Sequence, residues 1–182
     1  MELVYENINS VDLTELSRLI KNNEHRGYFL GNAGVEHYKL IAHISTMFEN
    51  SNLLDIGTYK GNSSLAMSYN TSNRIHSFDL NDLKDLYEFP TNVNYYIDNV
   101  LNGNYRDLIL SSPFILVDTY HDGIFEKQFH TYLKENNYLG YLLLDDIKLN
   151  EEMKEYWNWI EEEKYDISDF GHWSGTGIVI FK

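Results

Sequence analysis

The stretch Leu53-Leu54-Asp55-Ile56-Gly57-Thr58-Tyr59-Lys60-Gly61-Asn62-Ser63-Ser64 decides the fold class. Its opening residues form a short apolar run that ends at Gly57, which predicts a buried strand, and helical spacing resumes over 61–69. Two glycines four residues apart allow a tight turn and a close approach of the backbone to a ligand. The spacing matches neither the dinucleotide fingerprint nor a P-loop. It therefore favours a ligand without phosphate groups, with a plain strand-to-helix turn as the alternative.

Short apolar runs alternate with amphipathic segments on both sides of this stretch. We expect strands over 53–57, 75–79, 93–97, 113–118, 140–145, 165–170 and 177–181. We expect helices over 11–23, 35–49, 61–69, 81–88, 103–110, 124–136 and 149–162, with a loop at 27–34. This alternation predicts an α/β fold, in which a mostly parallel sheet has helices on both faces and the last two strands pair antiparallel.

Composition excludes several classes of function. The chain has 182 residues, 43% of them hydrophobic, which is enough for one domain with a real core. Its net charge of −14 argues against a nucleic-acid partner and against anionic membranes. The absence of cysteine excludes disulfides and thiolate metal sites. With neither a signal peptide nor an apolar span in the sequence, we expect a cytoplasmic protein, in the host cytoplasm if the source is a virus.

Polar residues follow each predicted strand at the edge of the sheet where such folds bind ligands. Asp79 lies about 20 residues beyond the glycine turn and suits hydrogen bonds to ribose hydroxyls, although it could instead cap a helix. Asp98 and Asn99 follow the third strand and suit either an adenosine contact or a turn.

Three carboxylates and an imidazole follow the fourth and fifth strands. Asp118 and His121 come after one strand, and Asp145 and Asp146 end the other. Carboxylates brought this close need a cation to stay ionised, and oxygen ligands suit Mg²⁺, Mn²⁺ or Ca²⁺. A capping turn and a surface histidine are the alternatives for these residues.

These residues together resemble class I S-adenosylmethionine (SAM)-dependent methyltransferases, from about Asn52 to the C-terminus. The resemblance implies a Rossmann-like sandwich whose seven-stranded, mostly parallel sheet has an antiparallel C-terminal strand. It also implies that SAM is the cofactor. The residues that it assigns to SAM binding are Asp55, Gly57, Thr58, Tyr59, Gly61, Ser63, Asp79, Leu80, Asp98, Asn99 and Asp118.

A narrower resemblance is to metal-dependent O-methyltransferases of the catechol and macrolide-sugar types. It implies that Asp118, Asp145 and Asp146 hold a divalent metal, Mg²⁺ in those families, and that His121 is the catalytic base. The base is lysine in the catechol type and histidine in some sugar enzymes. We therefore expect transfer to a sugar hydroxyl, for example of a deoxysugar such as rhamnose in a glycan. A catechol-type small-molecule enzyme and a non-catalytic SAM-binding module remain the alternatives.

The acceptor, either a small molecule or a glycan, is expected to meet two segments outside the strand ends. Glu36, His37 and Tyr38 open the second predicted helix, and His172 and Trp173 lie between the last two strands. We treat 1–182 as one domain, in which helices within 1–51 cover the active site of the core at 52–182. Three aromatic residues in 149–162 suit either a homodimer contact or ordinary core and rim packing. They are Tyr156, Trp157 and Trp159.

Overall fold

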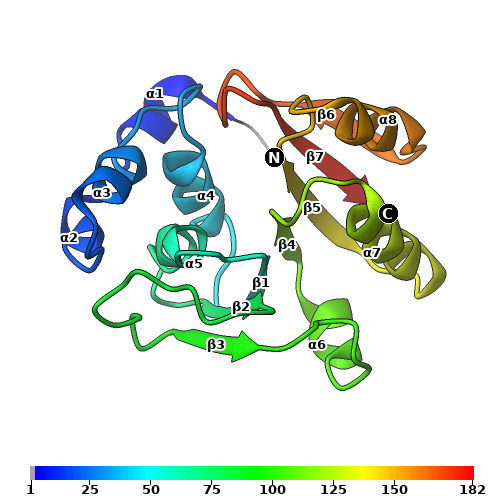
Figure 1. Ribbon diagram of the computed structural model, residues 1–182, viewed down its shortest axis with the longest axis horizontal. Helices are drawn as coiled ribbons and strands as arrows, with labels where there is room; N and C mark the ends of the chain where they lie inside the picture. The colour runs from blue at the N-terminus through cyan, green and yellow to red at the C-terminus, as the bar shows by residue number, and fades with distance from the viewer. Residues whose placement is uncertain (1–2) are drawn as a thin grey trace.

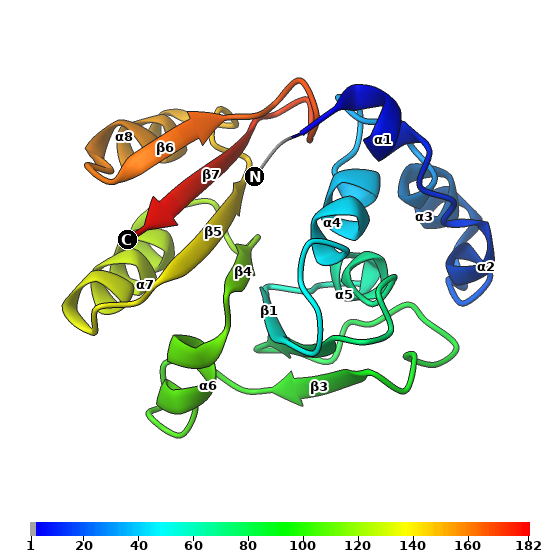
Figure 2. The same cartoon turned by 180° about the vertical axis from the view of Figure 1, so that it is seen from behind.

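A computed structural model describes residues 3–182, which form a seven-stranded sheet between two layers of helices (Figures 1 and 2). The strands are β1 (Asn52–Ile56), β2 (Arg74–Asp79), β3 (Val93–Ile97), β4 (Phe114–Val117), β5 (Gly140–Asp145), β6 (Glu163–Asp166) and β7 (Thr176–Phe181). Their order is β3-β2-β1-β4-β5-β7-β6. Strands β1 to β5 run parallel, and β7 lies antiparallel to both β5 and β6. The predicted α/β architecture is confirmed.

The alternation of side chains along the strands builds two hydrophobic cores, one on each face of the sheet. Leu53 belongs to one core and its neighbour Leu54 to the other, because successive strand residues point to opposite faces. The first core packs under α4 (Tyr38–Ser45) and α5 (Asn62–Met67). The second lies under α6 (Arg106–Ser111), α7 (Ile124–Glu135) and α8 (Glu151–Trp159). Burial on both faces explains why the strands are nearly continuous apolar runs.

The N-terminal region differs from the two predicted helices. It contains α1 (Tyr5–Asn9), α2 (Thr14–Ser17) and α3 (Asn23–Phe29) before α4 begins. The predicted helix over 11–23 is therefore reduced to one turn, and part of the predicted loop at 27–34 is helical. Asn22 explains the new boundary, since its side chain accepts hydrogen bonds from the backbone of Glu24 and His25 and caps α3. Both views show α1 to α3 beyond α4, away from the sheet (Figures 1 and 2).

The prediction of a helix over 81–88 is wrong, because these residues are not helical. Leu86 instead pairs with Ile20 in an antiparallel bridge, and Tyr87 N–H donates to the carbonyl of Leu19. The backbone of 85–87 thus bonds to the N-terminal region, and the side chain of Leu86 is buried. This long-range pairing overrides a weak local helix preference, and it also ends α2 early.

The last two strands occupy the predicted place with shifted bounds. The sixth strand is Glu163–Asp166 rather than 165–170, because residues 167–171 turn back on themselves through the hydrogen bonds of Phe170 to Ile167 and of Gly171 to Ser168. Among residues 3–182, no helix has both the length and the apolar character needed to cross a bilayer.

Candidate functional site

The turn after β1 lies against the end of β4 at the carboxyl edge of the sheet. Gly57 has a φ of 87°, and its N–H donates to the carbonyl of Phe78 at 2.9 Å. A Cβ at this position would overlap the carbonyl oxygen of Asp118 and lie 2.7 Å from its carbonyl carbon. Only glycine fits there without moving one strand end away from the other.

Asp79 ties the ends of β1 and β2 together. One carboxylate oxygen accepts the N–H of Tyr59 at 2.8 Å, and the other accepts the N–H of Asn81 at 2.9 Å. Each oxygen keeps further acceptor capacity, because a carboxylate offers about four lone-pair positions. Asp79 caps no helix, because residues 81–88 are not helical, but it holds the turn at Asn81 and keeps a position from which it can receive a ligand's hydroxyl groups.

A cavity of about 550 Å³ opens at these strand ends. Its polar side includes Asp79, Asp98, Asn99, Asp118 and His121, and its apolar side includes Ile56, Phe78, Leu80, Leu83, Val100 and Phe125. Gly57, Tyr59, Asn81, Thr119 and Tyr120 complete the lining. The volume and the mixture of apolar walls with a few polar groups suit a nucleoside-sized ligand.

Four residues expected at the cofactor do not line this cavity: Asp55, Thr58, Gly61 and Ser63. Asp55 is fully buried, and it accepts hydrogen bonds from Ser63 at 3.0 Å and from Ser64 at 2.5 Å. Burial raises the pKa of Asp55 against the opposing effect of these hydroxyls. The structure therefore places Asp55 under the turn, where its hydrogen bonds to Ser63 and Ser64 hold the start of α5, and outside the lining of the cavity.

The carboxylates after β4 and β5 meet three histidines. His121 Nε2 lies 3.0 Å from Asp118 Oδ1 and 3.3 Å from Asp146 Oδ2. His172 Nδ1 lies 3.3 Å from Asp146 Oδ1. Both His121 and Asp146 have left-handed backbones, with φ of 57° and 60°. Such strain in non-glycine residues is typical of functional sites.

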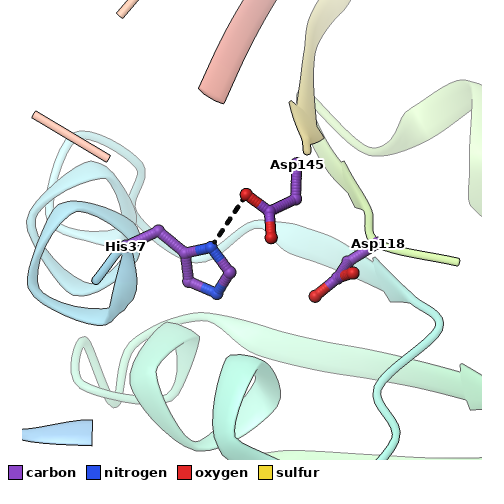
Figure 3. A group of neighbouring side chains, drawn as sticks. All are labelled: His37, Asp118 and Asp145. Carbon is purple, nitrogen blue, oxygen red and sulfur yellow. Dashed lines mark ion pairs between the residues drawn. The ribbon is translucent and has the colours of Figure 1, made fainter. Parts of the chain in front are cut away.

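His37 reaches the same cluster from the N-terminal helices. It immediately precedes α4, its side chain is 4% exposed, and its Nδ1 lies 3.1 Å from Asp145 Oδ1. The His37 ring and the carboxylates of Asp118 and Asp145 face a common space (Figure 3). Glu36 also contributes, with Oε2 3.9 Å from His172 Nε2. The structure thus brings Glu36, His37 and His172 together with the carboxylates after β4 and β5, while their contact with an acceptor stays a prediction.

Electrostatic coupling within this cluster is strong. Burial by itself lowers the pKa of His37, but Asp145 and the other facing carboxylates raise it to about 9. His121 behaves in the same way, and Asp118 and its neighbours raise its pKa to about 9. Burial raises the pKa of Asp118. Four acidic groups therefore share one small space with three imidazoles, an arrangement that a bound cation would stabilise.

The donor set of this cluster fits a divalent metal. Within residues 3–182, three groups of side chains each bring three ligand atoms within 4.8 Å of one another. These groups are His37, Asp118 and Asp145; Asp118, His121 and Asp146; and Asp145, Asp146 and His172. Each group combines carboxylate oxygen with imidazole nitrogen, and both are metal ligands in proteins.

Two residues predicted to touch the acceptor differ in their surroundings. Trp173 is 71% exposed and packs its ring 5.4 Å from that of His172, so its face is open beside the cluster. Tyr38 instead packs against Phe29, with ring centroids 5.4 Å apart, and burial raises its pKa. Trp173 is thus accessible to a ligand, whereas Tyr38 contributes to the N-terminal core.

Sequence reasoning missed the residues that hold the His121 turn in place. Glu126 is buried at the start of α7, where it accepts hydrogen bonds from Thr119 Oγ1 at 2.6 Å and from His121 N–H at 3.2 Å. Asn150 donates to the carbonyl of His121 at 2.8 Å. Acidic residues are common in the first turn of a helix because they interact favourably with the helix dipole. The sequence therefore does not show that Glu126 is buried or that it holds the His121 turn.

The predicted dimer surface on α8 is partly core. Tyr156 is fully buried, whereas Trp159 is 46% exposed. The structure therefore places these aromatic residues on both sides of the helix, and a homodimer stays a prediction.

Comparisons with known proteins support the fold. No protein-family model matches the sequence, and no curated protein matches it. A caffeoyl-CoA O-methyltransferase candidate from Staphylococcus aureus superposes with a TM-score of 0.61 at 16% identity, over 80% of this chain and 82% of that one. The O-methyltransferase TomG from Streptomyces achromogenes, solved with SAM, gives 0.54 at 15% identity over 100% of both chains. The chain has a class I methyltransferase fold.

A third structure has the same fold. The Podospora anserina methyltransferase PaMTH1, solved with the demethylated cofactor SAH, superposes with a TM-score of 0.54 at 15% identity. The match covers 97% of this chain and 86% of PaMTH1. The predicted resemblance to SAM-dependent methyltransferases is thereby confirmed at the level of the fold.

Proposed function

We propose that the protein is a SAM-dependent, divalent-metal-dependent O-methyltransferase that acts on a sugar hydroxyl. One observation carries the proposal: Asp118 and His121 belong both to the lining of the 550 Å³ cavity and to the carboxylate–histidine cluster. A methyl donor in the cavity and a hydroxyl group at the cluster would therefore be neighbours, as methyl transfer requires.

The chain's residues divide the work between donor and acceptor. Asp79 would accept hydrogen bonds from the ribose hydroxyls, while Phe78 and Val100 provide an apolar wall for the base. Asp118, Asp145 and Asp146 would hold the cation. Bound SAM supplies an electrophilic methyl group, and a bound cation lowers the pKa of the acceptor hydroxyl.

His121 is proposed as the general base. The facing carboxylates raise its pKa to about 9, but a cation held by Asp118, Asp145 and Asp146 would offset their charge and favour the neutral ring that can accept a proton. It would take the hydroxyl proton as the acceptor oxygen bonds to the methyl carbon, while the carbon–sulfur bond breaks and SAH leaves. Glu126 and Asn150 fix the turn that carries His121. A histidine at this position favours the sugar enzymes over the catechol type, in which the base is lysine. Trp173 would offer its exposed face to the sugar ring.

A transfer assay with labelled SAM tests this function. Deoxysugar glycosides with vicinal hydroxyls and catechols are offered in parallel, with and without EDTA. We expect methylated sugar, metal dependence, and a loss of about 10²–10⁴-fold in kcat for His121→Ala. The control is His43→Ala on α4, which removes a half-buried histidine outside the cluster. Methylation of catechols alone would contradict the sugar acceptor, and unchanged turnover in EDTA would contradict the metal.

A further inference from the structure

The strongest unexplained feature of the cluster is the second ring nitrogen of His37. Both ring nitrogens of this residue are buried and have no hydrogen-bond partner among residues 3–182, and Nε2 also lacks an ion-pair partner there. The residue as a whole is only 3% exposed. Buried polar atoms are nearly always paired, so an orphaned one needs an explanation. An ion pair with Asp145 involves only Nδ1, at 3.1 Å, and leaves Nε2 unexplained.

The position of the ring points to a ligand between His37 and the sheet. His37 faces Asp118 and Asp145 across a common space (Figure 3), and one nitrogen and two carboxylate oxygens lie within 4.8 Å of one another. The three residues come from the start of α4, the loop after β4 and the end of β5. A single cation could contact all three without rearrangement of the backbone.

We propose that His37 is a nitrogen ligand of the catalytic cation, together with Asp118 and Asp145, and that the site consequently prefers Mn²⁺ or Co²⁺ to Mg²⁺. The inference rests on the proposed function, because it concerns the metal of that same site. Mg²⁺ prefers oxygen ligands, whereas imidazole binds first-row transition metals more strongly. This assignment replaces the acceptor contact that the sequence suggested for His37.

A metal-ligand role for His37 would also make the N-terminal region part of the site. His37 is the one member of its metal group that does not come from the sheet edge. Metal binding would therefore attach α4 to the ends of β4 and β5 beside the cavity, and the metal should stabilise the protein against unfolding.

Metal binding to the intact protein tests the proposal directly. Metal-free protein is titrated with Mn²⁺, followed by the electron paramagnetic resonance of the free ion, and then in competition with Mg²⁺. Co²⁺ is followed by its visible absorption. The variants are His37→Gln and, as the matched control, His43→Gln within α4, the helix that His37 precedes. We expect wild type to bind Mn²⁺ at least ten-fold more tightly than Mg²⁺, and His37→Gln to lose about ten-fold or more of its Mn²⁺ affinity.

The ratio of the two affinities decides the outcome. His37→Gln should reduce the preference for Mn²⁺ over Mg²⁺, while His43→Gln should keep it. An unchanged ratio in His37→Gln, or a wild-type preference for Mg²⁺, would overturn the proposal. If His37→Gln does not fold, crystals of wild type with Mn²⁺ give the answer: an anomalous peak bonded to His37 supports the proposal, and one bonded to carboxylates alone refutes it.

Failure of this inference is distinguishable from failure of the proposed function. Methyl transfer that persists with Mg²⁺ and with His37→Gln would refute the nitrogen ligand and leave the methyltransferase intact. Mn²⁺ bound through His37 in a protein that binds no SAM would uphold the ligand and refute the enzyme.

Discussion

Replacement of Gly57 by alanine tests how closely the ends of β1 and β4 must approach to form the site. Alanine at a φ of 87° adds about 1–2 kcal/mol of backbone strain. Its Cβ would also overlap the carbonyl oxygen of Asp118, and forced overpacking of this kind costs about 1–3 kcal/mol. We therefore expect Gly57→Ala to lower the free energy of unfolding by about 2–5 kcal/mol.

Gly103→Ala is the matched control. Gly103 has nearly the same backbone conformation, with a φ of 84°, but a Cβ there would meet nothing within 4 Å. It should therefore cost only the strain, about 1–2 kcal/mol. The difference between the two variants isolates the contact with Asp118.

The assay combines urea denaturation with calorimetric SAM binding for both variants. Displacement of Asp118 should reduce SAM affinity at least about ten-fold in Gly57→Ala and leave it unchanged in Gly103→Ala, since 1.4 kcal/mol corresponds to a factor of about ten. Equal destabilisation of the two variants, or full SAM affinity in Gly57→Ala, would refute the packing argument.

Three further predictions concern other parts of the molecule. Asp55→Asn should lower stability by about 1–3 kcal/mol, measured by urea denaturation, because a neutral amide oxygen accepts the hydroxyls of Ser63 and Ser64 less strongly than the carboxylate oxygen that receives both. Trp173→Ala should raise the acceptor KM about ten-fold and leave SAM affinity unchanged in calorimetry, because its open face would meet only the acceptor. Burial opposes ionisation of Glu162, but its own backbone, His130 and Lys134 lower its pKa to about 2. Its stabilisation is therefore complete above pH 4.5 and lost as the pH falls toward 2, so Glu162→Gln should flatten the acid limb of stability against pH. Parallel curves for wild type and Glu162→Gln would contradict that assignment.

The strands of the sheet could be predicted well because the residue pattern that identifies each strand is local. Runs such as Phe114–Val117 are apolar on both faces, and turns such as that at Gly57 end a strand, so each strand can be located without knowledge of its neighbours. The segment 81–88 could not be predicted in this way. Its conformation depends on pairing with Leu19 to Lys21, more than 60 residues earlier in the chain.

The residues of the candidate site also differ in how far the local sequence pattern predicts them. Four carboxylates could be predicted as candidates because each lies at the end of a strand, or directly after it, and these strand ends are visible in the sequence: Asp79, Asp118, Asp145 and Asp146. The sequence suggested only an acceptor contact for His37. Its proposed role as a metal ligand could not be predicted, since nothing in the N-terminal pattern shows that this residue lies 3.1 Å from Asp145.

Isothermal titration of wild type and Asp79→Ala with SAM and SAH tests the central claim most directly. The account predicts one binding site on wild type for both ligands, and at least about ten-fold weaker binding to Asp79→Ala, because Asp79 is placed to accept ribose hydroxyls in the cavity. Absence of binding to folded wild type, or equal binding to the variant, would contradict a SAM site at the ends of β1 and β2.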